Sequence, residues 1–551
     1  SLDRLLGSGG HQFHPIEQMA DAAHALERLE TALRRRERIA LWGDYDADGM
    51  TAVSIWLLAL RALGGDPVRH VPSRLGDGYG LSAGGLRALR DAGVSVVVTS
   101  DCGVTNVDEV ESAARIGVDI VITDHHLPGP RLPAAVAVVD PHRADCRYPE
   151  KQLTGAGVAF KLATALLATR GVEVEGLAAL AAIGTVADMA PLLGENRAIV
   201  RVGLAELAST ERAGLRALVA RAANLPGRPT ARDLAFGVAP RLNAAGRIAE
   251  AELAIRLLIA EERDAAEALA DQLDALNRER QALTRSAVEE ALALCAAGAG
   301  DGPLIVRRDD WPPGIVGLVA GRLVDLLGRP VAAVSAVGDE LRGSVRAPAG
   351  FHVANALTAC AEHLTKLGGH PGAGGFSLPV ERFAAFSSAF ESLPGVFPLP
   401  LRAASGGPTR PASSPDARSA FDVDLVLPAN LVGWQLAAEI ERLEPFGVGW
   451  PEPVLAITGL VVGDVRRAGA EDSHLVLRML RGYESIDAVA FDTPVQRTLP
   501  EVGMRLDIVA TIDAGRWMGE PRLRLRVRDY AEAPESPIAA RRAVAPVAAT
   551  A

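Results

Sequence analysis

The sequence is poor in cysteine and has no long apolar run. Its 551 residues include 4 cysteines, and none lies close to another along the chain: they are Cys102, Cys146, Cys295 and Cys360. This spacing argues against a zinc knuckle, a CxxC redox pair and a disulfide framework. No apolar stretch approaches the roughly 18–20 residues that cross a bilayer, and the N-terminal residues lack the pattern of a signal peptide. We therefore expect a cytoplasmic protein with no membrane contact.

Lysine is also scarce. Only Lys151, Lys161 and Lys366 occur, so arginine supplies nearly all the positive charge. High-GC codon usage explains this bias, although arginine also suits bidentate phosphate contacts. The net charge of −11 excludes a wholly basic protein that wraps nucleic acid, but it leaves room for a local basic groove. The chain is 49% hydrophobic and 23% charged, which is typical of a globular protein, and its length predicts roughly three or four domains.

The first 150 residues or so alternate β-branched runs with helical patterns. The apolar runs "RIALW", "VSVVVTSDCG", "VDIVITDHH" and "AVAVVDPH" are separated by segments such as "TAVSIWLLALRALGG", whose apolar residues recur every three or four positions. Near-continuous valine and isoleucine runs between helices predict an α/β fold with a parallel sheet covered on both faces. In such sheets, binding sites lie beyond the carboxyl ends of the strands.

Carboxylates and histidines gather at those strand ends. Asp44, Asp46 and Asp48 follow the first run, Asp101 follows the next, and Asp124 precedes His125 and His126. Each cluster alone could be a turn or a helix cap, since aspartate is common in both. Three clusters at successive strand ends favour one shared site, with Asp188 joining from a later helix. Carboxylates with an imidazole suit Mn²⁺, or Mg²⁺ as the alternative, and cations would relieve the repulsion between the aspartates.

The rest of the chain divides by pattern. Residues 249–297 look helical throughout and are long enough to bridge two lobes. A second α/β pattern begins near 303, a Ser/Pro/Gly/Ala-rich linker follows, and five short strands of even spacing then suit an OB-like β-barrel. The predicted segments are 1–205 (first α/β domain), 206–300 (helical connector with a long bridging helix), 301–400 (second α/β domain), 401–420 (linker), 421–530 (OB-like domain) and 531–551 (disordered tail).

Four ordered motifs, "DYDADG", "SDCGVTN", "TDHH" and "GTVADMAPL", resemble those of the DHH phosphoesterase superfamily. "LRGSVRAP" and "GGHPGAGGFS" resemble its DHH-associated domain. With the long helix and the OB-like segment, residues from about 38 to 530 resemble the RecJ family of single-strand-specific 5′→3′ exonucleases. The resemblance makes 1–205 the DHH catalytic domain and 301–400 the DHH-associated domain.

The resemblance also implies roles for the clustered residues. Asp44 and Asp46 would hold one divalent ion, with Asp44 substituting for a histidine that related pyrophosphatases carry where this chain has Trp42. The other ion would be held by Asp48, His125 and Asp188. Asp101 would bridge the two ions, and His126 would contact the scissile phosphate.

Further residues are candidates for substrate binding. They are Arg74 and Tyr79 in "VPSRLGDGYGLS", Arg241, Asn243 and Arg247 in "PRLNAAGR", Ser344 and Arg346 in "GSVRAP", and His370 in the glycine-rich segment. "PRLNAAGR" is predicted to be a turn, and its arginines could equally be a structural pair at a domain joint. Tyr79 could stack on a base or simply pack. Arg522, Arg524, Arg526 and Arg528 alternate, so they could form either a solvated strand face or a track for the DNA backbone.

These observations predict a Mn²⁺-dependent exonuclease that releases nucleoside 5′-monophosphates from single-stranded DNA with a 5′-phosphate, in DNA repair and recombination. We expect a monomer, with a single-strand-binding protein and a helicase as partners implied by the family. Two alternatives stay open: a DHH hydrolase of short oligonucleotides, and a non-enzymatic DHH-fold scaffold of a replication complex.

Overall fold

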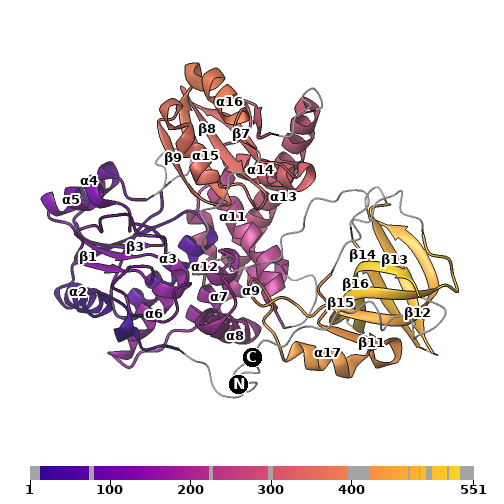
Figure 1. Cartoon of the computed structure of the whole chain (residues 1–551). Coiled ribbons are helices and arrows are strands. Elements are labelled where there is room, and N and C mark those ends of the chain that lie inside the picture. The colour runs from indigo at the N-terminus through magenta and orange to yellow at the C-terminus, as the bar shows by residue number, and fades with distance from the viewer. Residues whose placement is uncertain are drawn as a thin grey trace.

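The protein is described by a computed structural model (Figure 1) covering residues 13–72, 80–222, 228–295, 302–394, 421–469, 472–482, 484–491, 499–517 and 520–533. Its first sheet has five strands in the order β2-β1-β3-β4-β5, and all of its pairings are parallel. The strands are β1 (Arg38–Gly43), β2 (Val68–His70), β3 (Val94–Ser100), β4 (Asp119–Thr123) and β5 (Ala137–Val139). The predicted parallel sheet is confirmed.

Both faces of this sheet are buried, which explains its near-continuous apolar strands. Ile39 and Leu41 pack in one core, whereas Ala40 and Trp42 pack in another on the opposite face. The first face is covered by α2 (Ala22–Arg35), α3 (Ala47–Ala62) and α6 (Gly155–Ala168), and the second by α4 (Ala83–Asp91) and α5 (Val107–Arg115).

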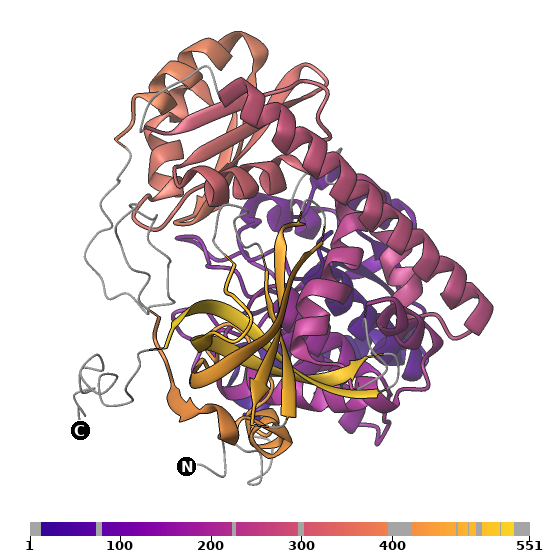
Figure 2. The ribbon, with the colours of Figure 1, turned by 90° about the vertical axis from the view of Figure 1, so that its right-hand side faces the viewer.

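Helices fill the region between the first sheet and the second. They are α7 (Leu177–Ala187), α8 (Gly194–Ser209), α9 (Ala213–Ala222), α10 (Ala231–Asp233), the π-helix η2 (Leu234–Val238), α11 (Ala239–Ile248), α12 (Glu252–Leu258) and α13 (Arg263–Cys295). The 33 residues of α13 form the long diagonal helix of Figure 2, about 50 Å by its rise. Two expectations are wrong in detail: the helix predicted over 249–297 is interrupted between α12 and α13, and the boundary predicted at 205 falls inside α8.

The second sheet is mixed, in the order β6-β7-β8-β10-β9. Its strands are β6 (Leu304–Arg307), β7 (Val331–Val337), β8 (Glu340–Arg346), β9 (Lys366–His370) and β10 (Ala373–Pro379), and its helices are α14 (Val316–Leu327), α15 (Val353–Ala359) and α16 (Phe383–Glu391). Side chains along β8 alternate between buried and half-buried, so Ser344 and Arg346 lie on the same face of the strand, as predicted.

The C-terminal strands close into a five-stranded barrel, as expected for an OB-like domain, because β12 pairs with both β13 and β15. The elements are β11 (Leu425–Pro428), α17 (Trp434–Glu441), β12 (Leu455–Ala468), β13 (His474–Arg481), β14 (Glu484–Ala490), β15 (Arg505–Trp517) and β16 (Glu520–Glu532). The last strand runs to Glu532, so the first two residues of the predicted tail belong to it. No helix in the described ranges is long and apolar enough to span a membrane.

Residues 443–450, which we call the docking segment, hold the barrel against α8. The guanidinium of Arg197 donates to the carbonyl oxygens of Leu443, Glu444 and Pro445, at 2.5, 3.1 and 2.6 Å. The backbone N–H of Leu192 donates to the carbonyl of Val448 at 2.7 Å. Since Arg197 is only 8% exposed, these bonds replace water around a buried charge. The barrel is therefore fixed to the first domain beside the loop that follows Asp188.

Replacing Arg197 with methionine should release the docking segment, because three carbonyl oxygens would lose a charged donor, and each such bond contributes about 1.5–3 kcal/mol. Differential scanning calorimetry should then show the barrel melting separately, below the main transition. Arg442→Met is the matched control, since Arg442 is exposed and pairs only locally with Glu439. A single unchanged transition in Arg197→Met would show that other contacts hold the barrel.

Candidate metal centre

The aspartates of "DYDADG" lie where β1 passes directly into α3. Asp46 is the N-cap of α3, and its side chain accepts a hydrogen bond from the N–H of Gly49 at 3.0 Å. Asp48 lies in the first turn and is 2% exposed. Aspartate at a helix N-terminus is stabilised both by capping and by the helix dipole. The same geometry turns these carboxylates toward the end of the sheet.

A second helix N-terminus holds Asp48. Its Oδ2 accepts from the N–H of Gly155 at 2.7 Å, and its Oδ1 accepts from the N–H of Ala156 at 2.9 Å, both in the first turn of α6. A Cβ added at Gly155 would lie 2.5 Å from the Cβ of Asp101, so only glycine leaves room for that side chain. Gly155 and Ala156 are not among the site residues predicted from the sequence. The signal was present, since "TGAG" places a cap and small residues at a helix start.

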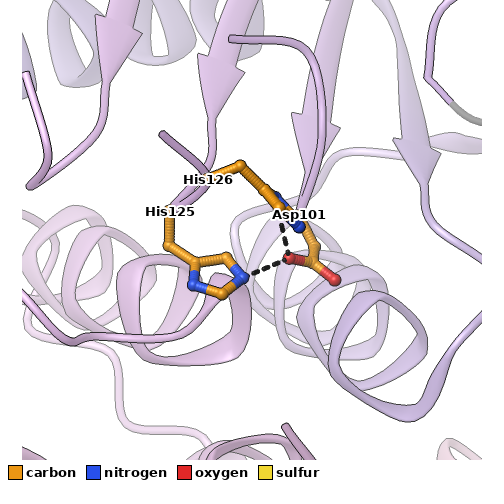
Figure 3. Close-up of side chains that lie close together, drawn as sticks. All are labelled: Asp101, His125 and His126. Carbon is orange, nitrogen blue, oxygen red and sulfur yellow. Dashed lines mark ion pairs between the residues drawn. The ribbon is translucent and has the colours of Figure 1, made fainter. Parts of the chain in front are cut away.

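Asp101 follows β3 and lies at the centre of the cluster. It is 1% exposed and has a left-handed backbone with φ of 67°, a conformation that aspartate and asparagine tolerate better than most residues. The Nε2 of His125 lies 3.0 Å from Oδ1 of Asp101, and 3.8 and 4.0 Å from carboxylate oxygens of Asp48 and Asp188. Figure 3 shows the rings of His125 and His126 turned toward the Asp101 carboxylate.

His126 is oriented by Asp124, which the sequence analysis placed at the strand end but gave no role. Oδ1 of Asp124 lies 2.8 Å from Nδ1 of His126 and accepts from the backbone N–H groups of both histidines. Its Oδ2 accepts from the N–H of Val104 at 2.9 Å. The Asp124 carboxylate therefore fixes the imidazole of His126, whose side chain is 44% exposed, at the rim of the cluster.

Three sets of side chains have ligand atoms within 4.8 Å of one another: Asp44 with Asp46 and Asp101, Asp48 with His125 and Asp188, and Asp101 with both histidines. The first two sets match the groups that the family resemblance implied for two ions, and Asp101 adjoins both. Trp42 takes no part, because its ring is buried in the opposite core and its indole N–H donates to the carbonyl of Gly80 at 3.2 Å. Asp44 instead lies close to Asp46 and Asp101, in the first of these sets.

The electrostatics of the cluster fit a cation. Burial and then the charges of Asp48 and Asp46 raise the pKa of Asp101 well above its ordinary value. Burial and the charge of Asp48 raise the pKa of Asp188 to about 7. Burial alone would lower the pKa of His125, but the charges of Asp48 and Asp188 outweigh it and raise that pKa. Oxygen donors with one imidazole are a donor set for Mn²⁺ or Mg²⁺, and divalent charge would offset the repulsion between these carboxylates.

Comparison with known proteins agrees with this geometry. Residues 38–185 match the family model "DHH family, N-terminal domain", 301–393 match "DHHA1 domain", and 423–529 match "RecJ OB domain". The single-stranded-DNA-specific exonuclease RecJ of Dickeya dadantii is 34% identical over 528 residues, covering 91% of this chain and 89% of that relative. The chain belongs to the RecJ family.

Two further relatives show how far the RecJ similarity extends. The RecJ of Bacillus subtilis is 35% identical over 523 residues, 94% of this chain, but this chain spans only 64% of that relative's length. The crystal structure of RecJ in complex with Mn²⁺ from Thermus thermophilus superposes with a TM-score of 0.76 at 31% identity, covering 96% of this chain and 73% of that one. Nearly the whole of the fold described above therefore has a counterpart in that solved RecJ structure.

The residues proposed for substrate binding in this RecJ-family chain fall into three groups. Arg74 and Tyr79 lie outside the described residues. Ser344, Arg346 and His370 come together: Nη1 of Arg346 donates to Oγ of Ser344 at 2.8 Å, and burial together with the charge of Arg346 lowers the pKa of His370. The third group, in "PRLNAAGR", lies in the helix α11, so the predicted turn is wrong.

Within α11 the side chains contact protein. Arg241 pairs with Asp274 of α13 at 2.7 Å, Asn243 accepts from the N–H of Ala47 at 2.8 Å, and Arg247 donates to the carbonyl of Gly314 at 3.1 Å. For Arg241 this favours the structural alternative at a domain joint. The arginine stripe of β16 is partly neutralised too, because Arg522 pairs with Asp487 and Arg526 pairs with Glu452.

The raised pKa values predict that metal-free protein loses stability as pH rises. The pKa of Asp188 in the folded state is about 7, above the ordinary value near 3.9, so the folded state binds more protons between these values. Stability without metal should fall from about pH 4 to about pH 7. Because ions need ionised ligands, the gain in Tm on adding Mn²⁺ should be larger at pH 8 than at pH 6. Melting curves in EDTA and in Mn²⁺ at both pH values test this, and a gain independent of pH would contradict it.

Proposed function

We propose that this RecJ-family protein is a single-strand-specific 5′→3′ exonuclease acting in DNA repair and recombination. The observation that carries the proposal is the cluster of Asp44, Asp46, Asp48, Asp101, His125 and Asp188 at one end of the parallel sheet, in a chain similar to RecJ exonucleases over most of its length. Each cycle would break the bond between the second phosphorus and the 3′-oxygen of the terminal nucleotide. The products are a nucleoside 5′-monophosphate and a strand that again begins with a 5′-phosphate.

The cofactor would be Mn²⁺, with Mg²⁺ as the alternative, in two ions. Asp44, Asp46 and Asp101 would hold one, and Asp48, His125 and Asp188, which adjoin Asp101, would hold the other. Such ions, when bound, polarise a phosphate and lower the pKa of a water nucleophile. The protein's own groups do the rest. His126, which Asp124 orients at the rim of the cluster, would donate a hydrogen bond to a phosphate oxygen. Its raised pKa, which the Asp124 hydrogen bond causes against the effect of burial, favours the protonated imidazole.

The terminal 5′-phosphate would be bound by Ser344, Arg346 and His370, with Arg74 as a further candidate. A guanidinium and a hydroxyl on one strand face supply charge-assisted donors, and the extra negative charge of a terminal phosphate distinguishes it from internal ones. The OB-like barrel would add affinity for the following nucleotides. We further propose a cytoplasmic monomer that works with a single-strand-binding protein and a helicase.

A nuclease assay distinguishes this function from the two alternatives. Long and short 3′-labelled single strands, each with and without Mn²⁺, should give a ladder that shortens from the 5′ end only with metal, and faster on long strands. Preference for short oligonucleotides would instead indicate a small-substrate DHH hydrolase. No metal-dependent cleavage of either would indicate a scaffold.

A further inference from the structure

Helix α11 connects residues 44–48, the metal-bearing loop, to the second domain through close contacts at two points along its length. At the first, Oδ1 of Asn243 accepts from the N–H of Ala47, the first residue of α3. Gly246 lies against the backbone of the same loop, and a Cβ added there would lie only 1.8 Å from the carbonyl oxygen of Tyr45. Because the atom it would meet belongs to the backbone, no side-chain adjustment could relieve the clash.

The C-terminal end of α11 meets the segment that leads into α14. Nη1 of Arg247 donates to the carbonyl of Gly314 at 3.1 Å, and a Cβ added at Gly314 would lie 1.9 Å from the carbonyl oxygen of Arg247. Three residues further on, a Cβ added at Gly317 would lie 3.1 Å from both Oγ of Ser344 and a guanidinium nitrogen of Arg346. The end of α11 therefore contacts Gly314, and Gly317 in the same segment lies against Ser344 and Arg346, the residues proposed to hold the terminal phosphate.

The helix is also fixed laterally. Arg241, six residues before Arg247, pairs with Asp274 of the long helix α13 at 2.7 Å. Asn243 and Arg247 are four residues apart, so they lie about 6 Å apart on the same side of α11. Figure 1 places α11 between the elements of the first and second sheets. A rigid helical turn thus separates the metal-bearing loop from the approach to Ser344 and Arg346.

We propose that α11 is a spacer that sets the distance between the metal centre and the site for the terminal phosphate, with Gly246 and Gly314 as positioning residues. The inference rests on the proposed exonuclease function and adds to it how the scissile bond is selected. The terminal 5′-phosphate and the scissile phosphate of the next nucleotide must be engaged at once for the 5′-phosphate to assist cleavage. A displacement of about 1 Å between the two sites can cost about a hundredfold in rate.

The test compares kcat/KM for 5′-phosphorylated and 5′-hydroxyl single strands in the full-length protein. Gly246→Ala and Gly314→Ala should each reduce the ratio of these constants at least fivefold, mainly through the phosphorylated substrate. Gly84→Ala, in α4, is the matched control, because no atom lies within 4 Å of a Cβ added there, and its ratio should equal that of the wild type. The Mn²⁺ affinity of Gly314→Ala, measured by electron paramagnetic resonance, should stay within twofold of the wild-type value.

A double-mutant cycle with Arg346→Ala tests whether Gly314 affects cleavage through the site for the terminal phosphate. If α11 acts through the phosphate site, adding Gly314→Ala to Arg346→Ala should change the ratio no further. An unchanged ratio in both glycine variants, equal losses on both substrates, or an effect at Gly246 without one at Gly314 would each overturn the spacer. A wild-type protein that shows no cleavage from the 5′ end would instead refute the proposed function itself.

Discussion

Replacing Asp101 with asparagine should lower kcat on single-stranded DNA by about a thousandfold or more. Asp101 adjoins both candidate ligand sets, so the change weakens the centre as a whole. Metal ions contribute several kcal/mol to stabilising such a transition state, and each 1.36 kcal/mol is a factor of ten in rate. Asparagine suits the test better than alanine, because it tolerates the left-handed backbone at this position and preserves the shape beside Gly155. Steady-state kinetics in saturating Mn²⁺ measure the effect.

The same substitution should leave the metal-free fold intact or slightly more stable. Asp101 is buried among like charges, so removing its charge relieves repulsion, and Tm in EDTA should not fall. Asp108→Asn is the control, since Asp108 is exposed on α5 and should retain full activity. Mn²⁺-dependent turnover near the wild-type rate in Asp101→Asn would show that Asp101 does not hold the ions.

Replacing Arg346 with alanine should slow cleavage of 5′-phosphorylated DNA by about ten- to a hundredfold and cleavage of 5′-hydroxyl DNA much less. Only the phosphorylated end loses a charge-assisted hydrogen bond, which contributes about 1.5–3 kcal/mol. The measurement is kcat/KM for both substrates. Arg322→Ala, which removes an exposed arginine from α14 in the same domain, should change neither constant.

An equal loss on both substrates would have a different meaning. Arg346 also donates to Oγ of Ser344 and to the carbonyl of Val345, at 2.8 and 2.9 Å, so its removal could disturb β8 itself. Ser344→Ala separates the possibilities: it removes a phosphate donor but leaves the guanidinium. If Arg346 selects the 5′ end, Ser344→Ala should show a smaller loss with the same preference for the phosphorylated substrate.

The fold was predictable where the hydrophobic pattern has one reading. The valine runs ending at Ser100 and Thr123 can only be strands buried on both faces, and the five short C-terminal runs became the barrel. The predictions were wrong where residues typical of turns lie in a helix that tertiary contacts stabilise. "PRLNAAGR" reads as a turn because it has a proline, an asparagine and a glycine, but Pro240 lies where the π-helix η2 passes without a break into α11, and the helix continues through it. Gly246 is tolerated inside that helix because of its contact with Tyr45.

The candidate site was predictable as a set of residues but not as an arrangement. Strand ends of a parallel sheet meet at one edge, which brings Asp44, Asp101 and His125 together from the sequence alone. The backbone donors from α6 that hold Asp48 could not be predicted, because they depend on how a helix more than 100 residues away docks. The partners of Arg241 and Asn243 could not be predicted for the same reason, since they lie on α13 and α3.

Because of the docking segment, the barrel does not depend on an unbroken chain to stay attached to the first domain. Arg197 and Arg201 donate to backbone carbonyls of residues 443–445, so the contact depends on the path of the segment more than on its side chains. These bonds attach the barrel directly to α8, so the chain between residues 394 and 421 need not hold it in place. A cut or an insertion in that stretch should leave the two pieces associated and active. The linker is thus free to vary in length and composition, whereas the backbone path of "LEPFGVGW" must be kept.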